Sequence, residues 1–367
     1  MTTQAVIPPE IEKTPDALVG RLFEASLGMF DIMAVYLGDQ LGLYRTLRDG
    51  AATSAELAGR AGIDERYARE WLEQQAATGI LQVDDLAAGP ADRRFSLPQA
   101  YVEPLIDKES PNSIAPLARS LVASAKVLPQ LIKAFRTGGG IAWADYGPDM
   151  IEAQGDFNRP WLVNSFGTGI IPAIPAVHNR LVSDRPVRVA DVACGVGWAA
   201  ISIARAYPRV RIDGFDLDES SIALAQQHAR EAGVSDRVTF AVRDVAEAET
   251  GQYDVAVIIE ALHDMTQPVG VLSSVRQMLR PDGVALIADE KTADSFTAPA
   301  DETERMYYGF SVFTCLPAAM TERPTAAIGT LLRADVMERL ASEAGFNRVE
   351  RLDEPALDML RFYVLTP

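Results

Sequence analysis

The sequence predicts an α/β fold in which a Rossmann-like, doubly wound, mostly parallel sheet ends in an antiparallel hairpin and follows a mostly helical winged-helix domain. Three observations support this prediction. From residue 185 onward, short runs rich in β-branched residues alternate with stretches of helical periodicity, as in parallel sheets. The last two apolar runs lie too close together for an intervening helix. Near the N-terminus, helical patterns precede a short hairpin pattern.

The composition is that of a globular protein with two domains. The chain has 367 residues, 48% hydrophobic and 23% charged, and a domain usually contains about 100 to 200 residues. A net charge of −17 disfavours nucleic-acid partners, so we expect a small-molecule substrate. Cys194 and Cys315 form no disulfide or metal-binding pattern, so we expect no metal site and a cytoplasmic location.

The N-terminal domain is expected at residues 15–160, after a flexible tail at residues 1–14. The tail contains prolines and acids in place of a basic start and an apolar core, so it is not a secretory signal. Apolar residues at spacings of three and four predict an amphipathic helix from about residue 16 to 47. Thr53 and Glu56 form a capping-box pattern that opens a short helix, and Gly62 ends it. No run is apolar enough to span a membrane.

A second helix over residues 64–78 and strand patterns at residues 80–83 and 94–97 complete the order of a winged helix. Such domains often bind DNA through this second helix. Here the helix carries Arg66 and Arg69 against four acids, so its face would repel phosphate. We therefore expect this domain to form a homodimer interface and a wall of the substrate pocket.

The glycine-rich segment 138–148 contains two aromatic residues, Trp143 and Tyr146. The segment could line a substrate pocket, or it could be an interdomain linker whose aromatic rings only pack. The sequence does not choose between these alternatives. The catalytic domain is expected to follow at residues 161–367.

Seven strand patterns define the catalytic domain. They are short, apolar and rich in β-branched residues, and the last two would form the antiparallel hairpin at the sheet edge. They lie at residues 187–192, 210–215, 238–242, 254–259, 284–288, 348–352 and 360–365.

A glycine loop follows the first of these strands. Residues 195–200, Gly-Val-Gly-Trp-Ala-Ala, fit the pattern of a dinucleotide site, where a helix N-terminus holds a pyrophosphate. Asp191 stands just before the loop, where a carboxylate would repel pyrophosphate. The same carboxylate suits the methionine end of S-adenosyl-L-methionine (SAM), which carries an ammonium and a sulfonium group.

Two further acids follow later strands. Asp216 closes the second strand and precedes Leu217, about twenty residues after the loop, where a carboxylate can accept both ribose hydroxyls. Asp244 follows the third strand, where its side chain could accept the adenine amino group while Val245 flanks the ring. The first position suits NAD and SAM alike, whereas the second favours SAM.

This succession of motifs resembles that of the class I SAM-dependent methyltransferases, over roughly the last half of the chain. The resemblance implies SAM as cofactor and S-adenosyl-L-homocysteine (SAH) as its product. One departure is Ala193, because the family commonly has glycine at that position. The residues that the resemblance assigns to the cofactor are Asp191, Ala193, Gly195, Gly197, Trp198, Asp216, Leu217, Asp244, Val245 and Glu260.

His263 is the candidate general base. It follows the fourth strand, at the sheet edge where ligands of open α/β sheets bind, whereas His178 and His228 lie elsewhere. Its Leu-His-Asp-Met segment resembles the Leu-His-Asp-Trp segment of small-molecule O-methyltransferases, whose histidine removes the acceptor's hydroxyl proton. Those enzymes also have an N-terminal winged-helix dimerisation domain. The pattern is similar, too, to that of actinobacterial winged-helix methyltransferases.

Histidine titrates near neutrality and can therefore take a phenolic or enolic proton as the methyl bond forms. A carboxylate would orient it. Asp264, its neighbour, and Glu290, at the end of the fifth strand, are the two candidates, and the sequence leaves the choice open. His263 could also be a structural residue that caps the turn after its strand.

Residues 291–330 form an insertion after the fifth strand. This position would place the insertion over the acceptor site, and its aromatic content suits an apolar acceptor. The alternative is core packing against the N-terminal domain. The expected lining residues are Tyr307, Phe313 and Cys315, joined by Trp143 and Tyr146 from the glycine-rich segment.

The sequence thus predicts SAM-dependent methyl transfer to a small molecule, at a hydroxyl oxygen, with His263 as base. Carbon methylation of an enolisable molecule would use the same histidine. Further alternatives are a SAM-sensing winged-helix regulator that binds DNA, another reaction of bound SAM such as decarboxylation or hydroxylation, and a dehydrogenase.

Overall fold

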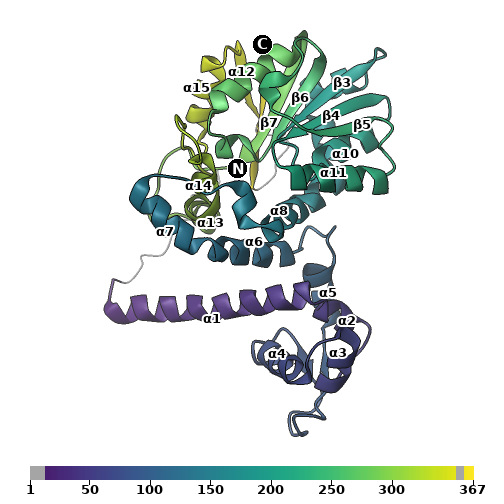
Figure 1. Ribbon diagram of the computed structural model, residues 1–367, viewed down its shortest axis with the longest axis vertical. Coiled ribbons are helices and arrows are strands. Elements are labelled where there is room, and N and C mark those ends of the chain that lie inside the picture. The colour runs from purple at the N-terminus through teal and green to yellow at the C-terminus, as the bar shows by residue number, and fades with distance from the viewer. Residues whose placement is uncertain (1–12, 353–358) are drawn as a thin grey trace, which may run out of the picture. The chain divides into compact units, whose positions relative to one another are not determined.

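The computed structural model describes residues 13–352 and 359–367 (Figure 1). Residues 1–12 of the expected N-terminal tail lie outside the described residues. The chain folds as two compact units that meet at residues 122 and 123. The boundary expected after residue 160 falls inside the second unit. Helix α8 (Pro148–Trp161) shows why, because a Cβ atom added at Gly155 would lie 2.3 Å from Val196 in the glycine loop.

The first unit is a winged helix preceded by a long helix. Gly42, with φ 65°, separates the first two helices, so the single helix expected to reach residue 47 is wrong. The expected capping box between Thr53 and Glu56 is confirmed. The elements are α1 (Pro15–Gln40), α2 (Leu43–Arg48), α3 (Ser54–Ala61), α4 (Glu65–Ala77), β1 (Gln82–Val83), β2 (Phe95–Ser96) and α5 (Gln99–Ile106).

Helix α6 (Ala115–Lys126) begins in the first unit and ends in the second. Several helices then lead to the sheet. They are α7 (Leu128–Thr137), η1 (Trp143–Tyr146), α8, η2 (Leu162–Ile170), η3 (Ile171–Ala173) and α9 (Pro175–Leu181).

The second unit contains a seven-stranded sheet of order β5-β4-β3-β6-β7-β9-β8. The first five strands of that order are parallel, and β9 pairs antiparallel with both β7 and β8. This confirms the predicted fold class. The strands are β3 (Val187–Val192), β4 (Val210–Asp216), β5 (Val238–Val242), β6 (Tyr253–Ile259), β7 (Leu279–Glu290), β8 (Arg348–Leu352) and β9 (Leu360–Thr366).

Helices cover both faces of this sheet (Figure 1). Alternate residues of β3 face opposite sides: Val189 packs with α10 (Trp198–Ala206) and α11 (Glu219–Glu231). Ala190 packs with α12 (Pro268–Met278) and α15 (Ala334–Glu343). The strand order reverses between β3 and β6, so their carboxyl ends form the crevice where open α/β sheets bind ligands.

The expected insertion after β7 folds as α13 (Glu302–Phe310), η6 (Ser311–Cys315) and α14 (Leu316–Ala319). Two short helical turns follow sheet strands: η4 (Val245–Glu247) after β5 and η5 (Leu262–Asp264) after β6. Within residues 13–352 and 359–367, no helix is long and apolar enough to cross a membrane.

Candidate active site

The glycine loop turns from β3 into α10 through three residues with positive φ. These are Ala193 at 55°, Gly195 at 51° and Gly197 at 87°. A Cβ atom at Gly197 would lie 2.6 Å from the ring of Phe240, so only glycine fits there. Ala193 adopts the left-handed conformation with its methyl group in place, which costs about 1 kcal/mol.

Asp191 joins β3 to the start of α10. Its side chain is buried, and the backbone N–H of Ala200 donates to its carboxylate at 3.0 Å. Burial raises the pKa of Asp191 to about 7, although this hydrogen bond lowers it. The Asp191 carboxyl group is therefore fixed against the first turn of α10, directly after the glycine loop.

Asp216 ends β4 and accepts hydrogen bonds from the backbone N–H groups of Gly195, at 2.8 Å, and Asp218, at 2.9 Å. Burial raises the pKa of the Asp216 carboxyl group, and these backbone hydrogen bonds oppose that rise. Leu217, next in the chain, is 72% exposed. An exposed apolar side chain therefore lies next in the chain to a carboxylate at the end of β4.

Asp244 and Val245 follow the neighbouring strand β5. Asp244 is exposed and accepts a hydrogen bond from the backbone N–H of Ala246, whereas Val245 is buried. Because β4 and β5 are parallel neighbours, Asp216 and Asp244 lie at the same edge of the sheet. Of these acids, Asp191 stands just before the glycine loop, where a carboxylate would repel a pyrophosphate.

Trp198, at the start of α10, lies in packed surroundings. Its ring stacks on His228 with a centroid separation of 4.3 Å, and the Cζ atom of Arg159 lies over the Trp198 ring, 4.4 Å from its centroid. The indole is buried. This side chain therefore stabilises the helix that follows the glycine loop.

His263 lies in η5, just beyond β6, and is 2% exposed. Its Nδ1 atom is 2.9 Å from Asp289 Oδ1 and 3.1 Å from Glu290 Oε2. Its Nε2 atom is 3.3 Å from Asp264 Oδ1. Both orienting candidates, Asp264 and Glu290, therefore contact the histidine, but a third carboxylate, that of Asp289, makes the shortest contact.

These contacts control the charge of His263. Burial lowers the pKa of His263, whereas the carboxylates of Asp264, Glu290 and Asp289 raise it. Together the carboxylates outweigh burial, so the pKa lies well above its ordinary value of 6.5. Burial also raises the pKa of Glu290, to about 7, and that of Asp264. The group as a whole therefore holds protons at neutral pH more strongly than its isolated side chains would.

Glu260, at the end of β6, has a left-handed backbone with φ 49°. Two amides of α8 donate to its carboxylate: Asn158 Nδ2 at 3.1 Å and Gln154 Nε2 at 3.4 Å. Burial and the nearby Glu290 carboxylate raise the pKa of Glu260 to about 8. Asn158 and Gln154 were not selected from the sequence, because no local pattern connects α8 with the end of β6.

The residues expected to line the pocket differ in burial and in their contacts. Cys315 is buried beside His263 and Asp264, and burial raises the pKa of its thiol to about 12. Tyr146 is also buried, and its hydroxyl donates to the backbone carbonyl of Phe313 at 3.0 Å. The Phe313 side chain itself is 43% exposed.

The other two expected pocket residues pack nearby elements together. Trp143 is half-buried, with its ring centroid 6.1 Å from that of Tyr146. Tyr307 is buried and donates its hydroxyl to the backbone carbonyl of Met359 at 2.6 Å. Of the five expected lining residues, Cys315 is therefore the one that lies against the histidine group.

The histidine group also has the spacing of a metal site. Possible ligand atoms of His263, Asp264 and Cys315, and those of His263, Asp289 and Glu290, lie within 4.8 Å of one another. Each ring nitrogen of His263, however, already faces a carboxylate at hydrogen-bond or ion-pair distance. We therefore interpret the group as a proton-holding network.

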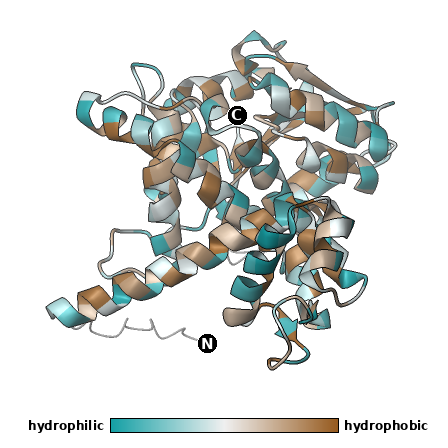
Figure 2. Ribbon diagram, turned by 60° about the horizontal axis from the view of Figure 1, so that its bottom comes forward, coloured by the Kyte–Doolittle hydropathy of each residue, from teal (hydrophilic) through white to brown (hydrophobic). Residues whose placement is uncertain are grey.

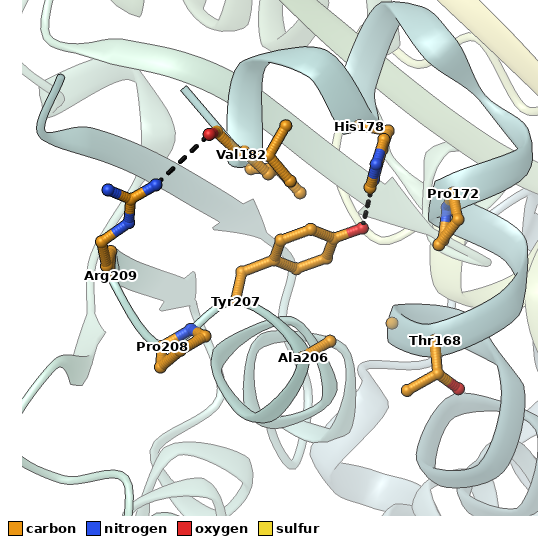
Figure 3. A pocket seen from close by; sticks show the side chains of 10 residues that line it. Thr168, Pro172, His178, Val182, Ala206, Tyr207, Pro208 and Arg209 are labelled. Carbon is orange, nitrogen blue, oxygen red and sulfur yellow. Dashed lines mark hydrogen bonds between the residues drawn. The ribbon is translucent and has the colours of Figure 1, made fainter. Parts of the chain in front are cut away.

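A separate surface pocket of about 390 Å³ lies around the end of α10 and the start of β4 (Figure 3). Its polar groups bond to one another: His178 Nδ1 lies 2.9 Å from the Tyr207 hydroxyl, and Arg209 donates to the Val182 carbonyl. The pocket adjoins the amino end of β4, so it is distinct from the crevice at the carboxyl ends of the strands, where Asp216 and His263 lie.

The topology, the glycine loop and the acids at successive strand ends define a nucleoside-binding α/β fold of the class I methyltransferase type. Comparison with protein families agrees with this class. Residues 183–341 match a methyltransferase domain, and residues 28–105 match an Rv2258c-like winged HTH domain.

Curated relatives include O-methyltransferases. The tetracenomycin polyketide synthesis 8-O-methyl transferase TcmO of Streptomyces glaucescens is 24% identical over 75% of this chain and 79% of its own length. A ubiquinone biosynthesis O-methyltransferase of Ralstonia nicotianae is 35% identical over 38% of this chain. That alignment covers 60% of the Ralstonia protein.

Solved structures share the fold over nearly the whole chain. Human N-acetylserotonin methyltransferase in complex with SAM has a TM-score of 0.69 and 16% identity, covering 97% of this chain and 99% of the human one. The mitomycin 7-O-methyltransferase MmcR has a TM-score of 0.66 and 19% identity, covering 96% and 98%. The chain is thus a SAM-dependent methyltransferase with an N-terminal winged-helix domain.

Proposed function

We propose that this enzyme transfers the methyl group of SAM to a hydroxyl oxygen of a small molecule, with His263 as general base. The observation that carries the proposal is the buried His263 at the carboxyl end of β6, in contact with three carboxylates. The raised pKa of His263 favours retention, within this group of side chains, of a proton that a phenol-like hydroxyl releases. The oxygen specificity of TcmO and MmcR supports the same reaction class.

The cofactor-binding residues expected from the sequence would contact different parts of SAM. SAM, when bound, supplies an activated methyl group on a sulfonium. Asp216 and Asp244 would accept from the ribose and the adenine, with Leu217 and Val245 against the ring. Asp191, Gly195 and Gly197 would form the floor beneath the methionine end, and Glu260 would face the site from β6. Positioning of both reactants would then supply much of the rate enhancement.

The acceptor would reach His263 from the side of Cys315 and the insertion. Cys315 is buried beside the histidine, and Tyr146 fixes the backbone of residues 313 and 314 through its hydroxyl. Tyr307, Phe313 and Trp143 would shape the more distant walls. An apolar, aromatic hydroxyl compound is the class of acceptor that fits these side chains.

Replacement of the base tests the proposal. We expect His263→Ala to retain SAH affinity by calorimetry but to lose at least about 10²-fold in turnover, the usual contribution of a general base. A panel of phenols assayed with labelled SAM supplies the acceptor. His178→Gln, in the separate surface pocket, is the matched control and should retain turnover. Unchanged turnover in His263→Ala would show that this histidine is structural.

Carbon methylation of an enolisable molecule is the second candidate, because the same histidine group could take a proton from an enol. The position of the labelled methyl group in the product decides between oxygen methylation and carbon methylation. A product whose methyl group resists ether cleavage would favour carbon methylation. Formation of a labelled methyl ether would favour the oxygen reaction.

We also propose that the winged helix does not bind DNA. In α4, Arg69 pairs with Glu65 at 2.6 Å, and Arg66 pairs with Glu70. Both arginines of the candidate recognition helix are therefore neutralised within the helix. A mobility shift with genomic DNA fragments at low ionic strength should detect no complex, and salt-sensitive binding would favour the SAM-sensing regulator instead.

The winged-helix unit is instead proposed to form a homodimer. Helix α1 has 26 residues, of which three are buried, Ala34, Val35 and Gly38. Hydrophobic residues recur along this helix (Figure 2), and many of their side chains are exposed. They are Leu18, Val19, Leu22, Phe23, Leu27, Met29, Phe30, Met33 and Leu37. An exposed apolar surface of this extent is typical of a protein interface.

A further inference from the structure

Each ring nitrogen of His263 faces a carboxylate, and this arrangement restricts how the histidine can take a proton. Nδ1 is 2.9 Å from Asp289 Oδ1, and Nε2 is 3.3 Å from Asp264 Oδ1. A neutral imidazole has one N–H and one bare nitrogen. A bare Nε2 facing an ionised carboxylate would be repelled, so a proton must lie between Nε2 and Asp264.

Burial shows which member of this chain an acceptor can reach. The side chains of Asp289 and His263 are 1% and 2% exposed, whereas that of Asp264 is 28% exposed. Asp264 Oδ1 itself is buried and has no hydrogen-bond partner apart from the ion-pair contact with the histidine. Asp264 is therefore the outermost group of the Asp289–His263–Asp264 chain.

We propose that Asp264 is a further catalytic residue, which receives the acceptor's hydroxyl proton and relays it to His263. This inference rests on the proposed hydroxyl methylation. As the acceptor oxygen bonds to the methyl carbon and the carbon–sulfur bond of SAM breaks, the hydroxyl proton moves to the second oxygen of Asp264. The proton between Oδ1 and Nε2 then resides on His263, which is paired with Asp289. The products are the methyl ether and neutral SAH, and the His263–Asp264 pair holds one proton more than it held before the reaction.

The surroundings favour retention of that proton, because the groups that face the pair from other elements are all acids. Asp289 and Glu290 come from β7, and Glu260 follows β6. Cys315 comes from η6 and contacts Asp264, and its thiol favours the ionised form of that carboxyl group. Tyr146 and Tyr307 contribute phenols.

Nuclear magnetic resonance can measure the protonation state of the His263 ring without a known acceptor. The chain has only three histidines, so their ring signals can be assigned individually. The full-length enzyme would be labelled with ¹⁵N-histidine and saturated with SAH. His263→Gln, His178→Gln and His228→Gln assign the three ring signals. We expect the His263 signals to stay constant from about pH 6 to 9 in the wild type, because the pair keeps its proton, and to titrate within that range in Asp264→Asn. A wild-type His263 ring that loses its proton near pH 6.5 would overturn the proposal.

Kinetic measurements provide a second test of the proposed proton relay. Asp264→Asn should lower kcat at least about 10²-fold on phenols that are neutral at the assay pH. A nitrophenol that is already ionised needs no base, so its methylation should change much less. A purely structural role would slow both acceptors equally. Asp236→Asn, on an exposed surface aspartate paired with Arg237, is the matched control.

The two proposals fail in different ways. If His263→Ala is inactive and Asp264→Asn is fully active, the relay is wrong and His263 remains the base. If both variants are fully active on neutral phenols, the base itself lies elsewhere. If no phenol in the panel is methylated, the ring titration alone decides whether the pair holds its proton.

Discussion

At the scale of single residues, buried carboxyl groups dominate the site. Asp191 contacts the first turn of α10, Glu260 directly follows β6, and Glu290 ends the neighbouring strand β7. Burial raises their pKa values to about 7, 8 and 7 from ordinary values of 3.8 for Asp and 4.5 for Glu. The folded enzyme therefore binds protons that the unfolded chain has already released.

This proton uptake predicts a pH dependence of stability. A carboxyl group whose folded pKa is raised favours folding below that pKa, and its contribution is lost as the pH rises through the interval between the two values. The raised pKa of His263 acts in the same direction. We therefore expect the urea midpoint of the ligand-free enzyme to fall from about pH 5 to pH 9.

The control for this prediction is the double variant Glu260→Gln with Glu290→Gln, which removes two of the three groups. Its urea midpoint should depend less steeply on pH over the same interval. A wild-type midpoint that rises steadily toward pH 9 would contradict the assigned pKa directions.

At the scale of elements, the glycine loop requires a particular backbone. Gly197 has φ 87°, and a side chain there would meet Phe240 at 2.6 Å and Ala225 at 3.0 Å. Gly233, at the end of α11, has φ 69° but open space around it. The two positions therefore separate backbone strain from overpacking.

We expect Gly197→Ala to destabilise the enzyme by about 2 to 5 kcal/mol, since it combines a strained backbone with a steric clash. It should also abolish SAH binding, because the loop must shift. Gly233→Ala should cost about 1 to 2 kcal/mol and leave SAH binding intact. Urea unfolding and calorimetric titration measure the two effects. Native SAH affinity in Gly197→Ala would show that the loop tolerates the shift.

The elements also show what the sequence could predict. The strands were predicted because their period and β-branched content are local properties, and β3, β5 and β8 agree with prediction to the residue. The contact between Asp289 and His263 was not predicted from the sequence. It depends on the pairing of β6 and β7, in which Ile259 lies level with Ala288, so that His263 reaches the end of β7. Nothing local to either segment encodes that register.

The same limit applies to helix α8. The amides of Asn158 and Gln154 reach Glu260 across more than one hundred residues of sequence. The sequence therefore indicated the residue types of the site, an ordered set of acids and one histidine. It could not indicate which carboxylate contacts which nitrogen, because that pairing arises from tertiary packing.

At the scale of the whole molecule, helix α1 carries many exposed apolar side chains and few buried residues. A helix with apolar residues around most of its circumference is normally buried in a protein core. In α1, Phe23 is 61% exposed and Phe30 is 63% exposed. A second copy of the chain is the partner that would always be present to cover such a helix.

Charges placed on α1 should therefore dissociate the enzyme. We expect sedimentation velocity to show a homodimer for the wild type and a monomer for Phe23→Glu with Phe30→Glu, because burying two carboxylates in an apolar interface is unfavourable. Leu86→Glu is the matched control, since Leu86 is 82% exposed but lies outside α1, and it should remain dimeric. A wild-type monomer at micromolar concentration, or a dimeric double variant, would show that α1 does not form the interface.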